Sequence, residues 1–357
     1  MTCQTQWTPS PIRHPDMDHA FSRWAAMEAT KRMAHGAAAW ETDDPGEASH
    51  PPSLSAWFGA APEVGAPYKL LIPVIDSPAS LSSIGIAIQM IRRVPDAELH
   101  LFNAQLIDRA DTESLARFGM QDTEAIRDVL CRQRIPFRLT IASGFAGDSI
   151  RAYAEREGVA EIVMGSKLFN RLGQMFFGSV AFDIAENCRT PVTLVRQGDL
   201  LPGKTRDDMD WLIPCDGRPA SLRAVRYLIG HLAASGRTPK IHLLNVQTQG
   251  HFPDERPLPR RGMSQRSDIQ PELSECQGQG LVQCRDAASL LEAARLPHDI
   301  HVMAGDPVSR ILEASNRFRN AHVVMGARRR RLFGARGFGS VADRIVLEIR
   351  RPLTLVK

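Results

Sequence analysis

The sequence predicts two doubly wound α/β domains, each a five-stranded parallel sheet flanked by helices. The second half of the chain repeats the first: LIPVIDSPASL (71–81) aligns without a gap on LIPCDGRPASL (212–222), and FGSVAFDIAENCRTPVTLVR (177–196) aligns on FGSVADRIVLEIRRPLTLVK (338–357). Within each copy, short apolar runs alternate with segments of helical periodicity. Continuous apolar strands separated by helices are typical of a parallel sheet covered on both faces.

Each copy contains five expected strands in the same order. They lie at 69–75, 99–104, 137–142, 160–165 and 191–196 in copy one, and at 211–215, 241–246, 298–304, 321–326 and 352–357 in copy two. The first helix is expected to bury Ile84, Ala87, Ile88 and Ile91 in copy one, and Leu222, Val225, Leu228, Ile229 and Leu232 in copy two. Later helices are expected at 122–134, 148–157 and from Ser179 in copy one, and at 281–295, 307–316 and from Ser340 in copy two.

The offset between the copies locates an insertion and divides the chain. It is 141 residues at the first strand and 161 at the last, so about twenty extra residues lie in copy two. The polar stretch 248–280, rich in Pro, Gly, Ser and Gln, predicts an exposed inserted loop there. Copy one is expected to span 68–198 and copy two 209–357. Residues 1–67 match neither copy, and a short amphipathic helix and a disordered extension both remain open for them.

The composition excludes several classes of protein. With 43% hydrophobic and 24% charged residues, the chain has ordinary globular composition. No apolar run approaches the ~20 residues of a membrane-spanning helix, and the N-terminus lacks a signal-peptide pattern. The six cysteines form no CxxC pair, so we expect neither a zinc cage nor a disulfide framework, and a cytoplasmic location fits. The net charge of +4 divides into −4 over residues 1–67 and +8 over the rest, which is too mild to predict nucleic-acid binding.

A glycine-serine pattern follows the fourth strand of both copies, as MGSKLFNRLGQMFFGSV (164–180) and MGARRRRLFGARGFGSV (325–341). A glycine after a strand lets the backbone approach a ligand closely, and the N-terminus of the next helix favours a phosphate. In doubly wound sheets, ligands bind beyond the carboxyl ends of the strands, at the switch point. The alternative is that these glycines only end strands and that the serines only cap helices.

These motifs resemble the universal stress protein family, whose nucleotide-binding members carry G-x2-G-x9-G-[S/T] at this place. The resemblance covers both copies, roughly 68–196 and 209–357, and implies tandem Rossmann-like domains of the adenine nucleotide alpha hydrolase type. It implies an ATP-binding protein of the stress response, with Mg²⁺ as the companion ion. The family's second glycine is replaced by Leu168 in copy one and Arg329 in copy two, where a side chain would either clash with a bound phosphate or require another path of the loop.

The resemblance places the site mainly in copy two. Family members use an aspartate at the end of strand one, and Asp216 matches it, whereas copy one has Ile75 there with Asp76 one position later. Because neighbouring strand residues point to opposite faces, we expect the copy-one site to be degenerate. Family members also stack an aliphatic residue after strand two on adenine, a position that Val246 matches. The residues that the resemblance assigns to the nucleotide are Pro214, Asp216, Val246, Gly305, Gly326, Arg328, Gly339 and Ser340 in copy two and Gly165, Gly178 and Ser179 in copy one.

Arginines crowd the loop after the fourth strand of copy two. Arg328–Arg331 and Arg336 are suited to clamping a triphosphate or another polyanion, and a solvated basic loop is the alternative. Few aromatic residues accompany them, so we do not expect a nucleic-acid partner.

No catalytic motif is present: the sequence has no GxSxG, HExxH or GxxxxGK[ST] pattern. Weak ATP hydrolysis or autophosphorylation is implied only by the resemblance. His100 and His242 occupy matching strand-two positions, and His298, His301 and His322 lie on later strands, for which we favour a structural role over metal binding.

Two functions remain open: a non-catalytic adenine-nucleotide-binding protein, and a nucleotide-free scaffold that works through protein–protein interaction. We expect the copies to pair as an internal pseudo-dimer through strand five, whose sequences PVTLVR and PLTLVK are nearly identical. A further homodimer and other protein partners stay open, and no membrane partner is expected.

Overall fold

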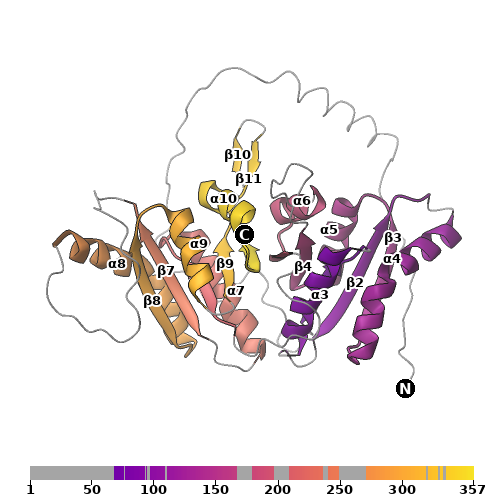
Figure 1. Ribbon diagram of the computed structural model, residues 1–357, viewed down its shortest axis with the longest axis horizontal. Coiled ribbons are helices and arrows are strands. Elements are labelled where there is room, and N and C mark those ends of the chain that lie inside the picture. The colour runs from indigo at the N-terminus through magenta and orange to yellow at the C-terminus, as the bar shows by residue number, and fades with distance from the viewer. Residues whose placement is uncertain are drawn as a thin grey trace, which may run out of the picture. The chain divides into compact units, whose positions relative to one another are not determined.

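The computed structural model describes most of the two repeated copies, with gaps in several of the segments that connect their elements (Figure 1). The described residues are 68–75, 77–92, 94, 97–108, 111–166, 179–196, 209–235, 240–248, 271–318, 321–328, 330–332 and 335–357. The N-terminal extension 1–67 therefore lies outside the described residues.

Each copy contains five long strands and four helices among its described residues. Copy one consists of β1 (Lys69–Pro73), α3 (Pro78–Ile91), β2 (Glu98–Gln105), α4 (Thr112–Arg132), β3 (Arg138–Ser143), α5 (Ala146–Glu157), β4 (Glu161–Ser166), α6 (Ser179–Asn187) and β5 (Val192–Arg196). Copy two consists of β6 (Trp211–Pro214), α7 (Pro219–Ser235), β7 (Ile241–Gln247), α8 (Pro271–Ala293), β8 (His298–Ala304), α9 (Pro307–Arg317), β9 (His322–Gly326), β10 (Arg330–Leu332), β11 (Ala335–Gly337), α10 (Ser340–Glu348) and β12 (Leu353–Val356).

All ten expected strands are present, and three segments differ from the sequence prediction. Helix α4 begins at Thr112 rather than near 122, because the side chain of Asp111 accepts a hydrogen bond from Ser114 N at 2.9 Å and caps the helix. The antiparallel pair β10 and β11 lies inside the arginine loop, where no strands were predicted.

Helix α8 begins at Pro271, so the expected loop is wrong for residues 271–280, while 249–270 lie outside the described part. The segment's polar, glycine-containing composition concealed this helix. At Gly280 an added Cβ would lie 2.5 Å from Val302 and 2.8 Å from Asn245 Oδ1, so the missing side chain lets α8 pack closely on β7 and β8.

The ten strands form one sheet in the order β3-β2-β1-β4-β5-β12-β9-β6-β7-β8. Strands are parallel within each copy. Only the junction is antiparallel, where β5 pairs with β12 in a register that places Thr193 opposite Thr354. The prediction that strand five joins the copies is therefore confirmed.

Helices cover both faces of this sheet, and the buried apolar side chains form three clusters. Helices α3 and α4 cover one face of copy one, and α7 and α8 one face of copy two, each over its own cluster. The third cluster lies under α5, α6, α9 and α10 and runs across both copies, with the Phe182 and Phe338 rings edge to face at 5.2 Å. The expected first-helix residues Ile84, Ala87, Ile88, Val225, Leu228 and Leu232 are buried.

A buried polar network crosses the junction between the copies. Glu161 is fully buried and accepts hydrogen bonds from Tyr68 at 2.8 Å and from Tyr227, on α7 of the other copy, at 2.6 Å. Its second oxygen accepts from Thr193 Oγ1. The network continues from Thr193 to Thr354 at 2.5 Å and from Thr354 to His322 Nε2 at 2.7 Å. Every hydroxyl in this seam thus has a partner, as buried polar groups require.

Basic residues at the ends of the two central strands reach into the opposite copy. Arg196 donates to the backbone oxygens of Val346 and Leu347, near the C-terminus of α10. Lys357 donates to the Cys188 oxygen, just beyond the C-terminus of α6. A cation is favourable at a helix C-terminus because it satisfies free carbonyl groups and opposes the helix dipole. Each copy therefore anchors the last helix of the other.

None of the described helices combines the length with the apolar character needed to cross a membrane.

Burial raises the pKa of Glu161, against the hydrogen bonds from Thr193, Tyr227 and Tyr68 that lower it. A raised carboxyl pKa in the folded state makes the free energy of unfolding fall as pH rises above the ordinary pKa of 4.5. We expect Glu161→Gln, which cannot ionise, to lose this part of the pH dependence. Denaturant unfolding across a pH series measures it. The exposed Glu124→Gln is the control, and identical slopes for wild type and Glu161→Gln would contradict the assignment.

Candidate functional site

The candidate site lies at the carboxyl ends of the copy-two strands. The chain runs outward from β6 to β7 and β8, then returns to place β9 on the other side of β6. The strand order therefore reverses between β6 and β9, which is the switch point where doubly wound sheets bind ligands.

Asp216 follows β6 and is exposed at this edge, as the sequence predicts. Its Oδ1 accepts hydrogen bonds from Arg218 N at 3.1 Å and from Ser221 Oγ at 3.0 Å. Pro214 is the last residue of β6 and is partly exposed. In copy one the matching Ile75 is 49% exposed, and Asp76 lies outside the described residues. An apolar side chain at this position cannot hydrogen-bond a ribose, so the two edges differ chemically.

Gly326 is the last residue of β9 and Gly165 the last but one of β4, and both lie directly against a helix. A Cβ at Gly326 would lie 1.9 Å from the Ala220 oxygen, and one at Gly165 would lie 2.0 Å from the Ala79 oxygen. Both glycines therefore allow a strand to contact the first turn of the helix after strand one. This contact supports the interpretation that they end strands, and it brings that helix close to the switch point.

Gly339 occupies the N-cap position just before α10 with φ 111°, a conformation that favours glycine. Among the described residues, no side chain caps this helix, and nothing lies within 4 Å of the position that a Cβ would occupy. Ser340 is exposed in the first turn, so the expectation that it caps the helix is wrong. Within the described part of the chain, the first N–H groups of α10 therefore receive no hydrogen bond from a capping side chain. In copy one Ser179 is likewise exposed at the start of α6, and Gly178 lies outside the described residues.

Arg328 lines a pocket of about 450 Å³ together with Arg189, Arg223, Ala327 and Lys357, which we call the basic pocket. Burial, with the positive charges of Arg328 and Arg226, lowers the pKa of Arg223. Arg223 donates to the Ala327 oxygen at 3.2 Å, while its buried Nε has no hydrogen-bond partner among the described residues. Cations that repel one another around a pocket favour an anionic ligand.

Arg328, which lines the basic pocket, donates its N–H to the oxygen of Phe338 at 3.0 Å, two residues before α10 begins, and this hydrogen bond closes the arginine loop. Sequence reasoning found Arg328 but missed Arg189 and Lys357, which flank strand five of the two copies. Only the antiparallel pairing of β5 with β12 brings these two residues together. Arg329 and Leu168, the departures from the family's glycine, lie outside the described residues.

The remaining predicted residues lie at the ends of β7 and β8. Val246 is partly buried and packs against the shared apolar cluster. Gly305 follows β8 and donates its N–H to the Gln247 oxygen at 3.0 Å. The next residue, Asp306, caps α9 by accepting from Ser309 N, and this hydrogen bond lowers its pKa. These residues belong to the same sheet edge as Asp216.

A model of the universal stress protein family matches residues 68–196 and again residues 211–357. The chain belongs to the universal stress protein family. Comparison with curated proteins found no match.

Solved structures with a similar fold include other family members. A universal stress protein from Archaeoglobus fulgidus has a TM-score of 0.58 at 16% identity, over 81% of this chain and 98% of that chain. A functionally unknown protein from Pseudomonas aeruginosa has a TM-score of 0.51 at 14% identity, over 82% and 93%. A family member from Arabidopsis thaliana, solved with AMP bound, has a TM-score of 0.30 at 16% identity, over 37% and 93%. The first two show that tandem Rossmann-like folds are shared at low sequence identity.

The contact at Gly326 makes a testable prediction. In Gly326→Ala the new Cβ would overlap the Ala220 oxygen, so the free energy of unfolding should fall by ~2 kcal/mol or more. The control is Gly230→Ala on α7, where nothing lies within 4 Å and alanine should be neutral or stabilising by up to ~1 kcal/mol. Denaturant unfolding compares them, and equal stabilities would contradict the packing role.

Proposed function

We propose that this universal stress protein binds an adenine nucleotide, ATP with Mg²⁺, at the carboxyl edge of copy two, as a conformational or stability switch in the stress response. Two observations carry the proposal: among the described residues no side chain caps the N-terminus of α10, and Arg328, on the loop that leads to this helix, lines the basic pocket. Free N–H groups and the helix dipole attract phosphate, and the pocket's cations attract the rest of a polyphosphate.

The other residues at this edge fit the remaining parts of a nucleotide. Asp216 is exposed beyond β6, where its carboxylate can accept a ribose hydroxyl. Val246 supplies a partly buried aliphatic surface for a flat base. Among the described residues, no group of three metal-binding side chains lies at this edge of the sheet. Mg²⁺ would therefore be held chiefly by the phosphates and by water, as is common for this ion.

A second function has one observation in its favour. Asp216 already accepts two hydrogen bonds from its own turn, so its exposed carboxylate is tied to the local backbone. This supports the alternative of a nucleotide-free scaffold, in which the basic pocket would receive an acidic group of a protein partner. Free thiols at Cys131, Cys188, Cys215 and Cys284 support placing either activity in the reducing cytoplasm.

Matched substitutions at the two helix starts test the nucleotide proposal. Ser340→Asp puts a carboxylate at the start of α10, and its repulsion of the phosphates should weaken ATP binding at least about tenfold. The same carboxylate interacts favourably with the helix dipole, so the helix itself should not be destabilised. Ser179→Asp makes the same change at the corresponding position of copy one and should leave ATP affinity unchanged.

Isothermal titration with ATP and Mg²⁺, together with thermal unfolding, provides the measurements. Specific binding must also raise the unfolding temperature of the wild-type protein. Absence of both heat and thermal shift at millimolar nucleotide would refute nucleotide binding. Equal losses in the two variants would instead refute the assignment to copy two.

A further inference from the structure

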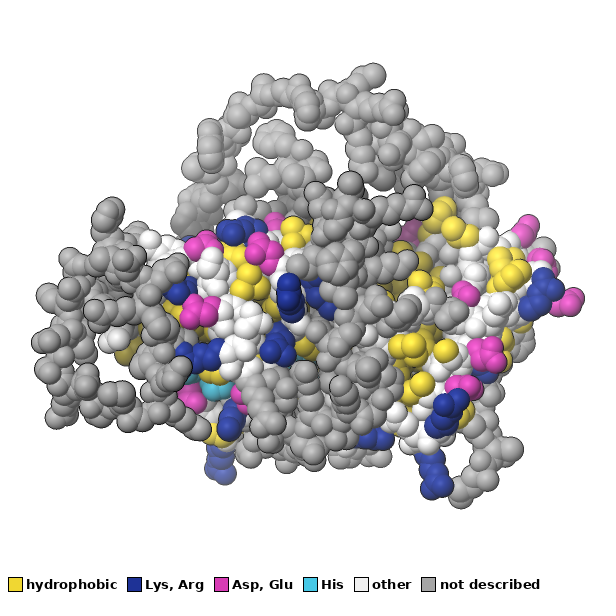
Figure 2. Space-filling model, viewed as in Figure 1, with side chains coloured by type: hydrophobic (Ala, Val, Ile, Leu, Met, Phe, Trp, Pro, Cys, Tyr) yellow, Lys and Arg dark blue, Asp and Glu magenta, His cyan; other side chains and the backbone are white. Residues whose placement is uncertain are grey.

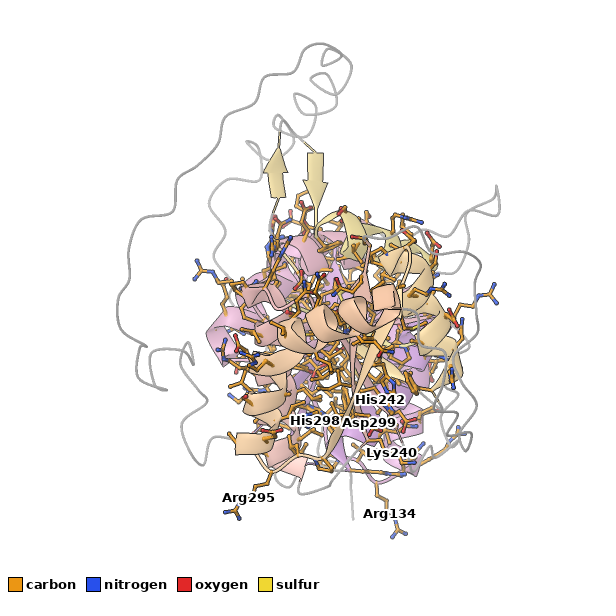
Figure 3. All side chains as sticks on the ribbon, turned by 90° about the vertical axis from the view of Figure 1, so that its left-hand side faces the viewer. Arg134, Lys240, His242, Arg295, His298 and Asp299 are labelled. Carbon is orange, nitrogen blue, oxygen red and sulfur yellow. The ribbon has the colours of Figure 1, made fainter. Side chains whose placement is uncertain are left out.

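A cluster of two histidines and an aspartate lies near the amino ends of the copy-two strands, at the edge opposite the candidate nucleotide site. His242 is on β7, and Asp299 and His301 are on β8, with His242 opposite Asp299 in the sheet register. Residues two apart on a strand point to the same face, so all three side chains share one face. Figure 3 shows His242 and Asp299 near each other beside Lys240, and Figure 2 shows histidine surface among charged side chains.

The ligand atoms of this cluster are as close as a metal ion requires. His242 Nδ1 lies 3.1 Å from His301 Nε2 and 3.8 Å from Asp299 Oδ2. All three ligand atoms lie within 4.8 Å of one another. Two histidine nitrogens bound to one tetrahedral Zn²⁺ at ~2.0–2.1 Å are separated by about 3.3 Å. The observed spacing therefore needs little adjustment to hold an ion.

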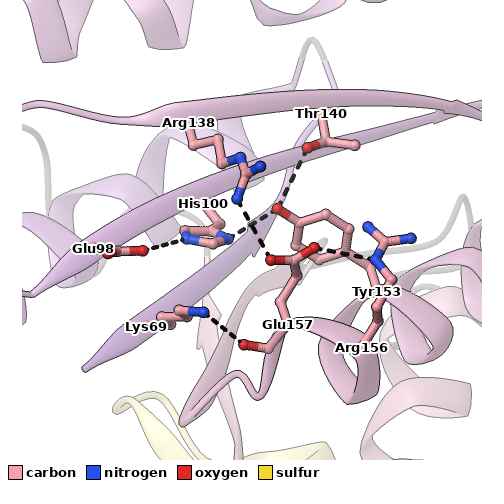
Figure 4. Close-up of polar contacts among 8 residues, drawn as sticks. All are labelled: Lys69, Glu98, His100, Arg138, Thr140, Tyr153, Arg156 and Glu157. Atoms are coloured by element: carbon pink, nitrogen blue, oxygen red, sulfur yellow. Dashed lines mark hydrogen bonds and ion pairs between the residues drawn. The ribbon is translucent and has the colours of Figure 1, made fainter. Parts of the chain in front are cut away.

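Copy one shows what this position looks like when it is purely structural (Figure 4). His100, in register with Arg138, occupies the place of His242. Its Nδ1 contacts the Tyr153 hydroxyl at 2.9 Å and its Nε2 contacts Glu98 at 3.1 Å. Both ring nitrogens are thus satisfied within the protein. A cation, Arg138, stands where Asp299 stands in copy two, and Thr140 stands where His301 does.

Copy two has lost both of these partners. The repeat offsets place Ala314 at the position of Tyr153 and Lys240 at the position of Glu98. The His242 side chain is only 7% exposed, and its Nε2 has no hydrogen-bond partner in the described part of the chain. The carboxylate oxygen Oδ2 of Asp210 lies 3.8 Å from this nitrogen. The ring stacks on Phe318 with centroids 3.9 Å apart, which fixes its plane.

We propose that His242 Nδ1, His301 Nε2 and the Asp299 carboxylate bind a divalent transition-metal ion of the Zn²⁺ type. Asp210 would accept the Nε2 proton of His242 and orient the ring, as carboxylates commonly do behind metal-bound histidines. The Asp299 side chain is 74% exposed, which provides an entry path and leaves the fourth position to water. This site is independent of nucleotide binding.

The electrostatic surroundings agree with this assignment. Burial lowers the pKa of both His242 and His301. Asp210 and Asp299 supply negative charge, against the positive charges of Lys240 near His242 and Arg317 near His301. A neutral histidine pair with a carboxylate is a donor set suited to Zn²⁺, Co²⁺ and Ni²⁺.

Titration of the full chain, without an affinity tag, by Co²⁺ followed by Zn²⁺ competition tests the proposal. We expect one equivalent of Co²⁺ to give a visible spectrum without thiolate-to-cobalt charge transfer, and Zn²⁺ to displace it. Asp299→Arg, which copies the residue of copy one, and His301→Asn should each weaken binding at least ~100-fold. Asp210→Asn should weaken it by about 10–100-fold, the usual effect of removing a carboxylate behind a ligand.

His298→Asn is the control, because His298 lies on the same strand but its Nδ1 faces the Leu296 oxygen at 3.2 Å. It should bind Co²⁺ as the wild type does. Circular dichroism and thermal unfolding establish that the variants are folded, and Asp299 is exposed enough for its replacement to be tolerated. Failure of the folded wild type to bind Co²⁺ or Zn²⁺, or unchanged affinity in Asp299→Arg and His301→Asn, would overturn the proposal. A thiolate spectrum would also overturn it, by placing the ion at cysteine.

Discussion

The antiparallel contact between β5 and β12 is the constraint on which the rest of the structure depends. It turns two five-stranded sheets into one and gives each central strand a neighbour on both sides. It also merges the apolar layer under α5, α6, α9 and α10 into a single cluster, so that neither copy has a separate core on that face. The basic pocket exists only because Arg189 of copy one is brought beside Lys357 of copy two. The joined sheet and the basic pocket therefore both result from the pairing of β5 with β12.

The two copies share the same backbone packing but carry different side chains at the edges of the sheet. The close contact of Gly165 with Ala79 and of Gly326 with Ala220 shows that the same packing solution is kept at both switch points. After its first strand copy two has the exposed Asp216, where the aligned residue of copy one is the exposed, apolar Ile75. At the opposite edge, only copy two combines histidines with Asp299, where copy one carries Arg138. The candidate binding residues at both edges of the sheet therefore belong to the second copy.

The fold could be predicted from the sequence because repeated apolar strands identify a parallel sheet wherever they occur. Helix α8 could not be predicted at its start, since Gly278 and Gly280 disfavour a helix locally and only packing on β7 and β8 compensates. Asp216 and Gly339 were identifiable because a motif marks them. The basic pocket and the His242 cluster depend on side chains from separate elements. Their residues become neighbours only through strand pairing, which sequence spacing does not encode.

The buried hydrogen bonds that link His322 to Glu161 across the junction between the copies all point the same way. If Thr193 donates its proton to Glu161, the Thr193–Thr354 hydrogen bond takes its proton from Thr354, and Thr354 then accepts one from His322 in the tautomer that is protonated at Nε2. Glu161 and His322 stand at equivalent places in the repeat, one ending the chain as pure acceptor and the other beginning it as donor. In a dimer of identical subunits, both of these places would hold the same residue. With an acceptor at both places, the contact between the two threonines would have no proton to share. With a donor at both places, the contact would have two protons. Fusion of the copies in one polypeptide permits this polarity, because the two halves no longer obey exact twofold symmetry.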